Sequence, residues 1–391
     1  MQMPLNIGEV MKAAADTDAA RMMPISVELF FDQDCGEDLR AFVSDAFATE
    51  APKARVYMQD YPARKPELDF DTDLAVLVAG LSKNTGALCD HIRGLGVPVM
   101  IVTVMPELVR EMAQANNHPL LPEDIVAPSA QVDGSGLPAD HELNCEPYPL
   151  TVDRCRNLAN RMGDWVVSTF REKRLAFALA FDFVRRPLSM DFTNATAVQN
   201  AGIGMVALIP GADMPVMTLN QAKMVLQIAA AYGQKLGRER AMGLLCVVGG
   251  GFACRTLARQ LVSVVPAFGW VVKGGVGFAG TIAMGCATIA YFEALEGEGM
   301  RPEDALGAAR DEALKIKAEM AACESPAQAA LAGARMLVQG AANAGIEKAK
   351  ALVPSARGAL QDICEYTNMN LADVGRNIIA SVADQMKKKK D

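Results

Sequence analysis

The chain has 391 residues, of which 51% are hydrophobic and 21% charged, and this length exceeds one ordinary core, so two or three domains are expected. Its net charge of −8 is unevenly spread: residues 1–150 carry 24 acidic and 10 basic side chains, whereas residues 151–391 carry 22 acidic and 28 basic ones. The acidic first part argues against nucleic-acid binding there, because it would repel a phosphate backbone.

The start of the chain and its cysteines indicate the cellular compartment. Residues 1–24 form an N-terminal segment in which no basic head precedes an apolar stretch, so no secretory signal is expected. The nine cysteines stand singly among apolar neighbours, as in Leu245-Cys246. This usage is typical of reduced, core-filling cysteines in a cytosolic compartment.

Residues 25–115 alternate strand and helix patterns. Strands are predicted at 25–31, 55–58, 74–79 and 97–104, and helices at 37–49 and 85–95. Two of the strands are continuous apolar runs, as in strands buried on both faces of a sheet. Strands separated by helices of this length predict an α/β domain with a parallel sheet, of the Rossmann or GTPase-like type.

The turn after the first strand lacks the chemistry of a phosphate-binding loop. Such a loop needs glycines for close backbone approach, a lysine for the phosphates and a hydroxyl for Mg²⁺. Residues 32–38 read Asp-Gln-Asp-Cys-Gly-Glu-Asp, with one glycine, no lysine and four carboxylates. A guanine-reading Asn/Thr-Lys-x-Asp is also missing after the last strand, where Val102-Thr103-Val104-Met105-Pro106 stands instead. We therefore expect a degenerate domain that does not hydrolyse nucleoside triphosphates, with Asp34 or Gly36 capping a helix.

Metal and cofactor sites are not expected. The three histidines and nine cysteines lack the paired short spacings of metal ligands. Residues 116–150 are rich in Pro, Gly, Asn and Asp and predict a linker. No residue is predicted to be catalytic.

From residue 151 onward the pattern is helical, with a module at 151–300 and a helical extension at 301–391 that ends in a basic tail, residues 387–390. Two uncharged runs, 192–212 and 274–292, contain 21 and 19 residues. Crossing the hydrocarbon core takes roughly 20 apolar residues, so the module is expected to associate with a membrane. Basic residues just before the first run fit this reading. A packed soluble bundle has the same pattern, and that alternative stays open.

Polar residues in this module predict a helical hairpin. Pro210, Gly211, Asp213 and Pro215 mark a reversal between two helices. Thr218 and Gln221 then have the spacing of a capping box. The polar stripe of the second helix consists of Asn220, Lys223, Gln227 and Gln234. We expect Asp213 to pair with Lys223 in a network that includes Asn220 and Gln227 and fixes the hairpin, or else Lys223 to face solvent.

Gly277, Thr281 and Gly285 recur every four residues, which lets helix backbones approach closely.

Several consecutive motifs resemble a bacterial family catalogued as domain of unknown function 697, in its actinobacterial form. They lie at 196–215, 218–224, 228–233, 255–259 and 265–270, and the resemblance begins near residues 174–181. Members of that family are often joined to Era- or Ras-like GTPase domains and are commonly described as membrane proteins. The resemblance therefore implies a GTPase-like first domain, and no catalytic residue is carried over from it. The motif residues singled out are Gln199, Asn200, Pro210, Gly211, Asp213, Pro215, Asn220, Gln221, Lys223, Tyr232, Arg255, Arg259 and Trp270.

These observations predict a non-catalytic scaffold or adaptor on the cytoplasmic side of the inner membrane. It would combine a degenerate GTPase-like domain with an apolar helical module, form a homo-oligomer and bind a protein partner. Two alternatives remain. One is a soluble, cytoplasmic, homo-oligomerising helical protein, and the other is an NTPase with an unrecognised site.

Overall fold

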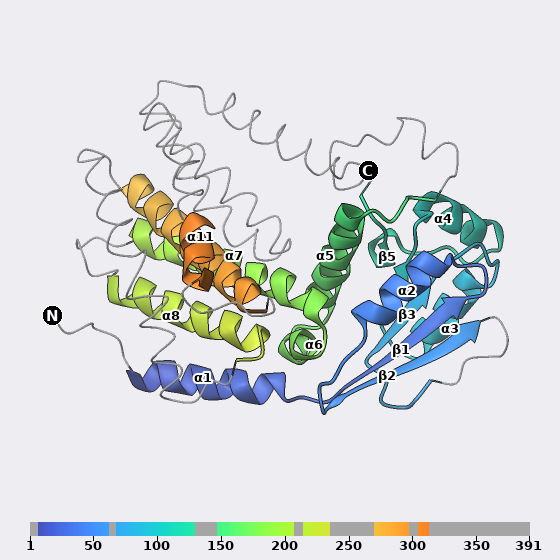
Figure 1. Ribbon diagram of the computed structural model, residues 1–391, viewed down its shortest axis with the longest axis horizontal. Helices are drawn as coiled ribbons and strands as arrows, with labels where there is room; N and C mark the ends of the chain where they lie inside the picture. Colours follow the sequence, from blue (N-terminus) through green and yellow to red (C-terminus); the bar gives the residue numbers. More distant parts are fainter. Residues whose placement is uncertain are drawn as a thin grey trace, which may run out of the picture. The chain divides into compact units, whose positions relative to one another are not determined.

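The computed structural model describes residues 7–61, 68–129, 147–206, 214–234, 270–296 and 304–312 (Figure 1). The chain divides into two compact units. One unit comprises residues 19–188 and the other combines residues 1–18 with 189–391. The two helices α1 (Ile7–Arg21) and α7 (Asp182–Val206) each contribute residues to both units.

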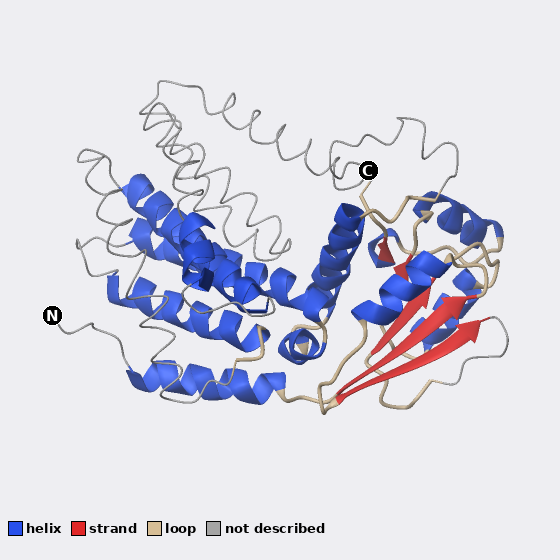
Figure 2. Cartoon of the chain, in the orientation of Figure 1, coloured by secondary structure: helices blue, strands red, loops and turns tan. Residues whose placement is uncertain are grey.

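The unit formed by residues 19–188 contains a five-stranded parallel sheet, shown in red in Figure 2. Its strands are β1 (Ile25–Asp32), β2 (Ala54–Tyr61), β3 (Leu74–Val78), β4 (Val99–Val102) and β5 (Ile125–Val126). They lie in the order β2-β1-β3-β4-β5. This is the doubly wound order of flavodoxin, in which the chain reverses direction across the sheet between β1 and β3. The parallel α/β architecture expected for the first domain is thereby confirmed.

Helices cover both faces of the sheet. They are α2 (Glu37–Ala46), α3 (Thr85–Gly94), α4 (Pro106–Ala115), α5 (Val152–Thr169) and α6 (Arg174–Ala180). Phe30, Leu77 and Ile101 point to the face where α3 and α4 supply Leu88, Ile92, Val109 and Ala113 to one buried cluster. On the other face, the guanidinium of Arg40 on α2 lies 4.5 Å from the ring centroid of Phe31. Every residue of β1, β3 and β4 is buried, and burial on both faces explains why β3 and β4 are continuous apolar runs.

The stretch 116–150, expected to be a linker, contributes to the sheet. Within it, the turn η1 (Pro122–Asp124) leads into β5, which pairs with β4. The amide of Tyr148 donates to the carbonyl of Val104 just beyond β4, at 2.8 Å. Helices α5 and α6, assigned from the sequence to the helical module, belong to the same compact unit as the sheet. The α/β unit therefore extends well past residue 115.

The other unit is helical in its described part. It contains the end of α7, α8 (Met214–Ala231) and α11 (Trp270–Glu296). The run 274–292 lies inside α11, and residues 192–206 of the other apolar run lie in α7, whereas residues 207–212 lie outside the described residues. Within the described stretches, no helix combines the length and the apolar character that a membrane crossing requires.

The structure corrects two details of the predicted hairpin. Helix α8 begins at Met214, so Thr218 lies inside the helix and the predicted capping box with Gln221 is wrong. Gln234 lies beyond the helix end, so the polar stripe is shorter than expected. The chain leaves α8 through Gly233, whose φ of 72° is accessible to glycine, and the amide of Gln234 bonds to the carbonyl of Ala229 at 2.9 Å.

Candidate functional site

The crevice at the carboxyl ends of β1 and β3 is where doubly wound folds bind their ligands. Here the last residue of β1, Asp32, is 1% exposed and turns its carboxylate toward the loop after β3. Its Oδ2 accepts hydrogen bonds from the amides of Gly80 at 3.0 Å and Ser82 at 3.1 Å, and its Oδ1 accepts one from the amide of Asp34 at 3.2 Å. An internal carboxylate thus uses the amide donors that an anionic ligand would need.

The two loops around this crevice are in direct backbone contact. A Cβ atom placed on Gly80 would lie 2.4 Å from the carbonyl carbon of Asp34 and 2.6 Å from the amide nitrogen of Cys35. Any other residue at position 80 would push the loops apart. Beside them, the hydroxyl groups of Tyr61 and Thr85 are 3.1 Å apart in a buried hydrogen bond. The crevice between β1 and β3 is therefore closed by the chain itself.

Two titratable side chains at this edge, Cys35 and Tyr61, have raised pKa values. Burial raises the pKa of the Cys35 thiol, although the Arg40 guanidinium partly opposes that rise. Burial also raises the pKa of the Tyr61 hydroxyl, and the charge of Asp32 adds to the effect. A cysteine acts as a nucleophile as the thiolate, which a raised pKa disfavours. In the described parts of the chain, no group of His, Cys, Asp and Glu side chains is arranged to hold a metal ion.

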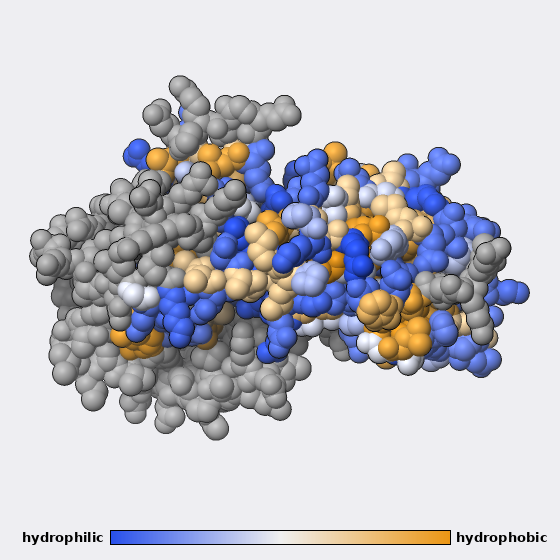
Figure 3. Space-filling model, turned by 90° about the horizontal axis from the view of Figure 1, so that it is seen from below, coloured by the Kyte–Doolittle hydropathy of each residue, from blue (hydrophilic) through white to orange (hydrophobic). Residues whose placement is uncertain are grey.

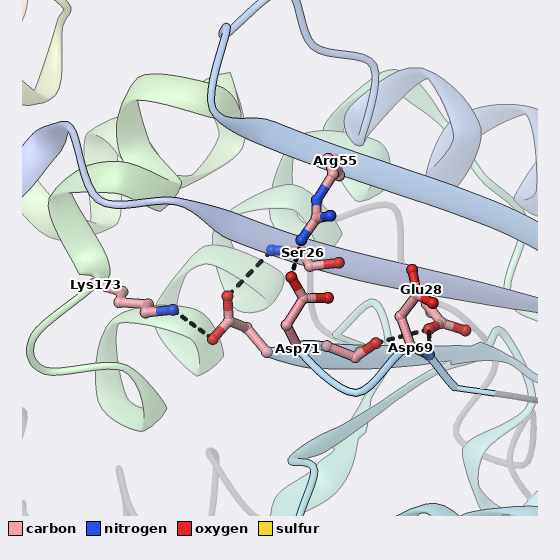
Figure 4. A network of polar contacts seen from close by, with 8 residues as sticks. Ser26, Glu28, Arg55, Asp69, Asp71 and Lys173 are labelled. Atoms are coloured by element: carbon pink, nitrogen blue, oxygen red, sulfur yellow. Dashed lines mark hydrogen bonds and ion pairs between the residues drawn. The ribbon is translucent and has the colours of Figure 1, made fainter.

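A second polar network fastens the loop before β3 to the sheet (Figure 4). Glu28 of β1 is buried and accepts three hydrogen bonds, from the amide of Asp69, the hydroxyl of Thr72 and the side chain of Gln59. Arg55 pairs with Asp71. Asp73 accepts a bond from the amide of Ser26 at 3.1 Å and pairs with Lys173 at 2.7 Å. Residues 69 and 71–73 of this loop are therefore all held in place.

This anchored loop exposes an aromatic side chain. Phe70, between two of the fixed residues, is fully exposed. The neighbouring strand β2 is an edge strand, and its Tyr57 and Met58 are 43% and 53% exposed. Figure 3 shows apolar patches among the polar side chains on the face that it displays. Exposed aromatic side chains on a rigid support are typical anchors of protein–protein contacts.

Three of the residues singled out from the helical module, Asn200, Asn220 and Gln221, meet Thr281 in one polar cluster. Asn200 on α7 is fully buried, and its amide nitrogen donates to the hydroxyl oxygen of Thr281 on α11 at 3.0 Å. The carbonyl oxygen of the same side chain accepts from Asn220 on α8 at 3.0 Å. Gln221 on α8 also donates to Thr281, at 3.1 Å. One polar cluster therefore joins three helices.

Small residues allow these helices to approach. A Cβ on Gly285 of α11 would lie 2.2 Å from the side chain of Thr193 on α7, so no larger residue fits. This contact confirms the close approach expected from the small residues of the last apolar run. At the other end of α8, Tyr232 stacks on Phe292 with ring centroids 5.6 Å apart, and its hydroxyl donates to Glu293 at 3.3 Å.

The predicted pairing of Lys223 with Asp213 falls on a residue outside the described structure and stays a prediction. Asp213 lies outside the described residues, and the Lys223 ammonium is 3.8 Å from the carboxylate of Glu9 on α1. The side chains are 39% and 52% exposed, so the pair is in contact with water. Exposed pairs of this kind contribute about 0–1 kcal/mol to stability. Asn220 itself donates to Asn200 in the polar cluster.

The other singled-out residues are placed as follows. Gln199 is exposed on α7, next to the buried Asn200. Pro215 lies in the first turn of α8, where a missing amide proton costs no helical bond. Trp270 is the first residue of α11. Pro210, Gly211, Asp213, Arg255 and Arg259 lie outside the described residues, as does the basic tail.

Sequence reasoning missed three of the polar residues that organise these sites. Glu28 had a recognisable signal, because it is a carboxylate in the middle of a mostly apolar strand. Thr281 was noted only as a small residue, although it receives two of the hydrogen bonds in the helical cluster. The sequence shows Asp32 only as one of the acidic residues that repel phosphate. Its carboxylate accepts a hydrogen bond from the amide of Gly80, which is 48 residues further along the chain, so only the folded structure reveals that role.

Comparisons with known proteins give no relative. No protein-family model, no curated protein and no solved structure matches the chain. The resemblance to domain of unknown function 697 therefore stays a prediction based on its motifs.

Proposed function

We propose that this protein is a non-catalytic scaffold or adaptor whose α/β unit is a degenerate, GTPase-like domain. The observation that carries the proposal is the carboxylate of Asp32, which accepts the amide hydrogen bonds of Gly80 and Ser82 in the crevice between β1 and β3. A nucleotide phosphate there would have to displace an internal negative charge. The absence of a lysine from the adjoining turn makes that exchange more unfavourable.

The adaptor part of the proposal is supported by the exposed Phe70 and the edge strand β2. The loop that carries Phe70 is held by Glu28, Arg55 and Lys173, so little conformational entropy is lost when a partner binds it (Figure 4). Asp69 and Asp71 flank the aromatic ring and would favour a partner surface with basic side chains.

The proposed location is the cytoplasmic side of a bacterial inner membrane, reached through the helical module as a homo-oligomer. The apolar character of α11 and its close contact with α7 support this part of the proposal. The pair of Lys223 and Glu9 on water-accessible sides of α8 and α1 favours the alternative, a soluble helical protein that self-associates.

The first test concerns nucleotides. Isothermal titration of the full-length chain with GTP or ATP in Mg²⁺ should give no micromolar binding, because the crevice is already filled and acidic. Micromolar binding that is lost on changing Gly36 or Asp34 would instead support the alternative of an NTPase with an unrecognised site.

The second test concerns the membrane. After expression in bacteria, the intact chain is expected to stay in the membrane pellet through a carbonate wash, because we propose that the uncharged runs at 192–212 and 274–292 hold the helical module on the membrane. A variant lacking residues 192–295 is expected in the soluble fraction. Recovery of the intact chain in the cytosol without detergent would favour the soluble alternative.

A further inference from the structure

Arg154, in the first turn of α5, is a buried cation that forms no ion pair with any residue in the described part of the chain. The residue is 2% exposed, and its Nε and Nη2 atoms have no hydrogen-bond acceptor in the described structure. An unpaired charge in the protein interior is strongly unfavourable, so buried guanidinium groups are normally found with an anion. The Nε–H and one Nη2–H bond lie in the guanidinium plane and point outward from the same edge of the group. They are a pair of donors that binds two oxygens of one carboxylate or phosphate.

Hydrogen bonds place the first turn of α5 at the carboxyl edge of the sheet. Ser129, just beyond β5, donates its amide to the side chain of Asn157 at 2.9 Å. Near the other end of α5, the indole of Trp165 donates to the carbonyl of Glu123, just before β5. Helix α5 therefore runs antiparallel to the strands and begins beside their carboxyl ends. Side chains on a helix lean toward its N-terminus, so the Arg154 side chain leans toward this edge.

A further feature makes the region positive. The N-terminus of α5 carries the positive end of the helix dipole. Burial raises the pKa of the Cys155 thiol, and the charge of Asp38 on α2 adds to that rise. In the described structure, Asp38 makes no ion pair with Arg154.

We propose that Arg154 binds the phosphate or carboxylate group of a small anionic ligand at the carboxyl edge of the sheet, beside the ends of β4 and β5. This site is separate from the crevice between β1 and β3 that Asp32 closes. It does not depend on the proposed scaffold function, because it needs neither a phosphate-binding loop nor Mg²⁺.

The test uses the full-length chain and two probes, inorganic phosphate and acetate, titrated at constant ionic strength against sodium chloride. We expect one probe to raise the melting temperature and to slow amide exchange in the first turn of α5. Arg154→Lys should weaken that response about tenfold, because an ammonium cannot make the side-on, two-oxygen contact. Arg156→Lys, an exposed arginine on the same helix, is the matched control and should respond like the wild type.

The outcomes separate the ligand classes. A response to phosphate alone assigns a phosphoryl group, and a response to acetate alone assigns a carboxylate. Arg154→Leu gives a second measurement, since without added anion it should melt no lower than the wild type if the guanidinium is unpaired. The proposal is overturned if neither probe acts differently from chloride, or if Arg154→Lys and the wild type respond equally.

Discussion

Replacing Asp32 by alanine should destabilise the α/β unit by about 3–5 kcal/mol, as expected when a buried charged acceptor is removed from its donors. The carboxylate accepts amide hydrogen bonds from Asp34, Gly80 and Ser82, and the Gly80 bond is buried. Alanine supplies no acceptor, and the close contact of Gly80 with the backbone of residue 34 leaves little room for water. Asp32→Asn keeps one acceptor oxygen, so its loss should be smaller, about 1–3 kcal/mol.

The measurement is urea unfolding followed by circular dichroism, together with hydrogen exchange of the Gly80 and Ser82 amides. Asp34→Ala is the matched control, since that side chain is exposed in the same turn and its amide survives the change. It should alter stability by no more than about 0.5 kcal/mol. If Asp32→Ala behaved like this control, the carboxylate would not hold the two loops together.

The sheet was largely predictable, and the part that was missed has a physical reason. Strands β3 and β4 are buried on both faces, and such strands leave continuous apolar runs in the sequence. Strand β5 has only Ile125 and Val126, inside a stretch rich in proline and acidic residues. Two residues are too few to show any periodicity. That strand is defined by its pairing with β4, which only the folded chain reveals.

The polar cluster shows what sequence periodicity can and cannot give. The spacing of polar residues places Asn220 on the polar face of a helix. The resemblance to the family motifs singles out Asn200 and Gln221. Periodicity does not say which helix faces meet, so Thr281 on α11 was not assigned to them. The same limit applies to the contact between Lys223 and Glu9, because the two residues lie more than 200 positions apart in the chain.

Replacing Asn200 by leucine should cost the helical unit about 2–4 kcal/mol, although leucine is apolar and similar in size. Asn200 is the only residue of the cluster that bonds to both α8 and α11 from α7. Its loss leaves the amide of Asn220 without this acceptor and removes a donor from the Thr281 hydroxyl. Unsatisfied polar groups in a buried network cost more than the hydrogen bonds contributed.

A double-mutant cycle with Thr281→Val distinguishes this network from simple packing. If the two side chains act together, the second substitution should cost less in the Asn200→Leu background, with a coupling of about 0.5–3 kcal/mol. Gln199→Leu is the matched control, because the neighbouring side chain on α7 is exposed and should change stability by about 0.5 kcal/mol or less. Unfolding and amide exchange in α7, α8 and α11 are the measurements. Additive effects, or a more stable Asn200→Leu chain, would show that apolar packing alone holds the three helices together.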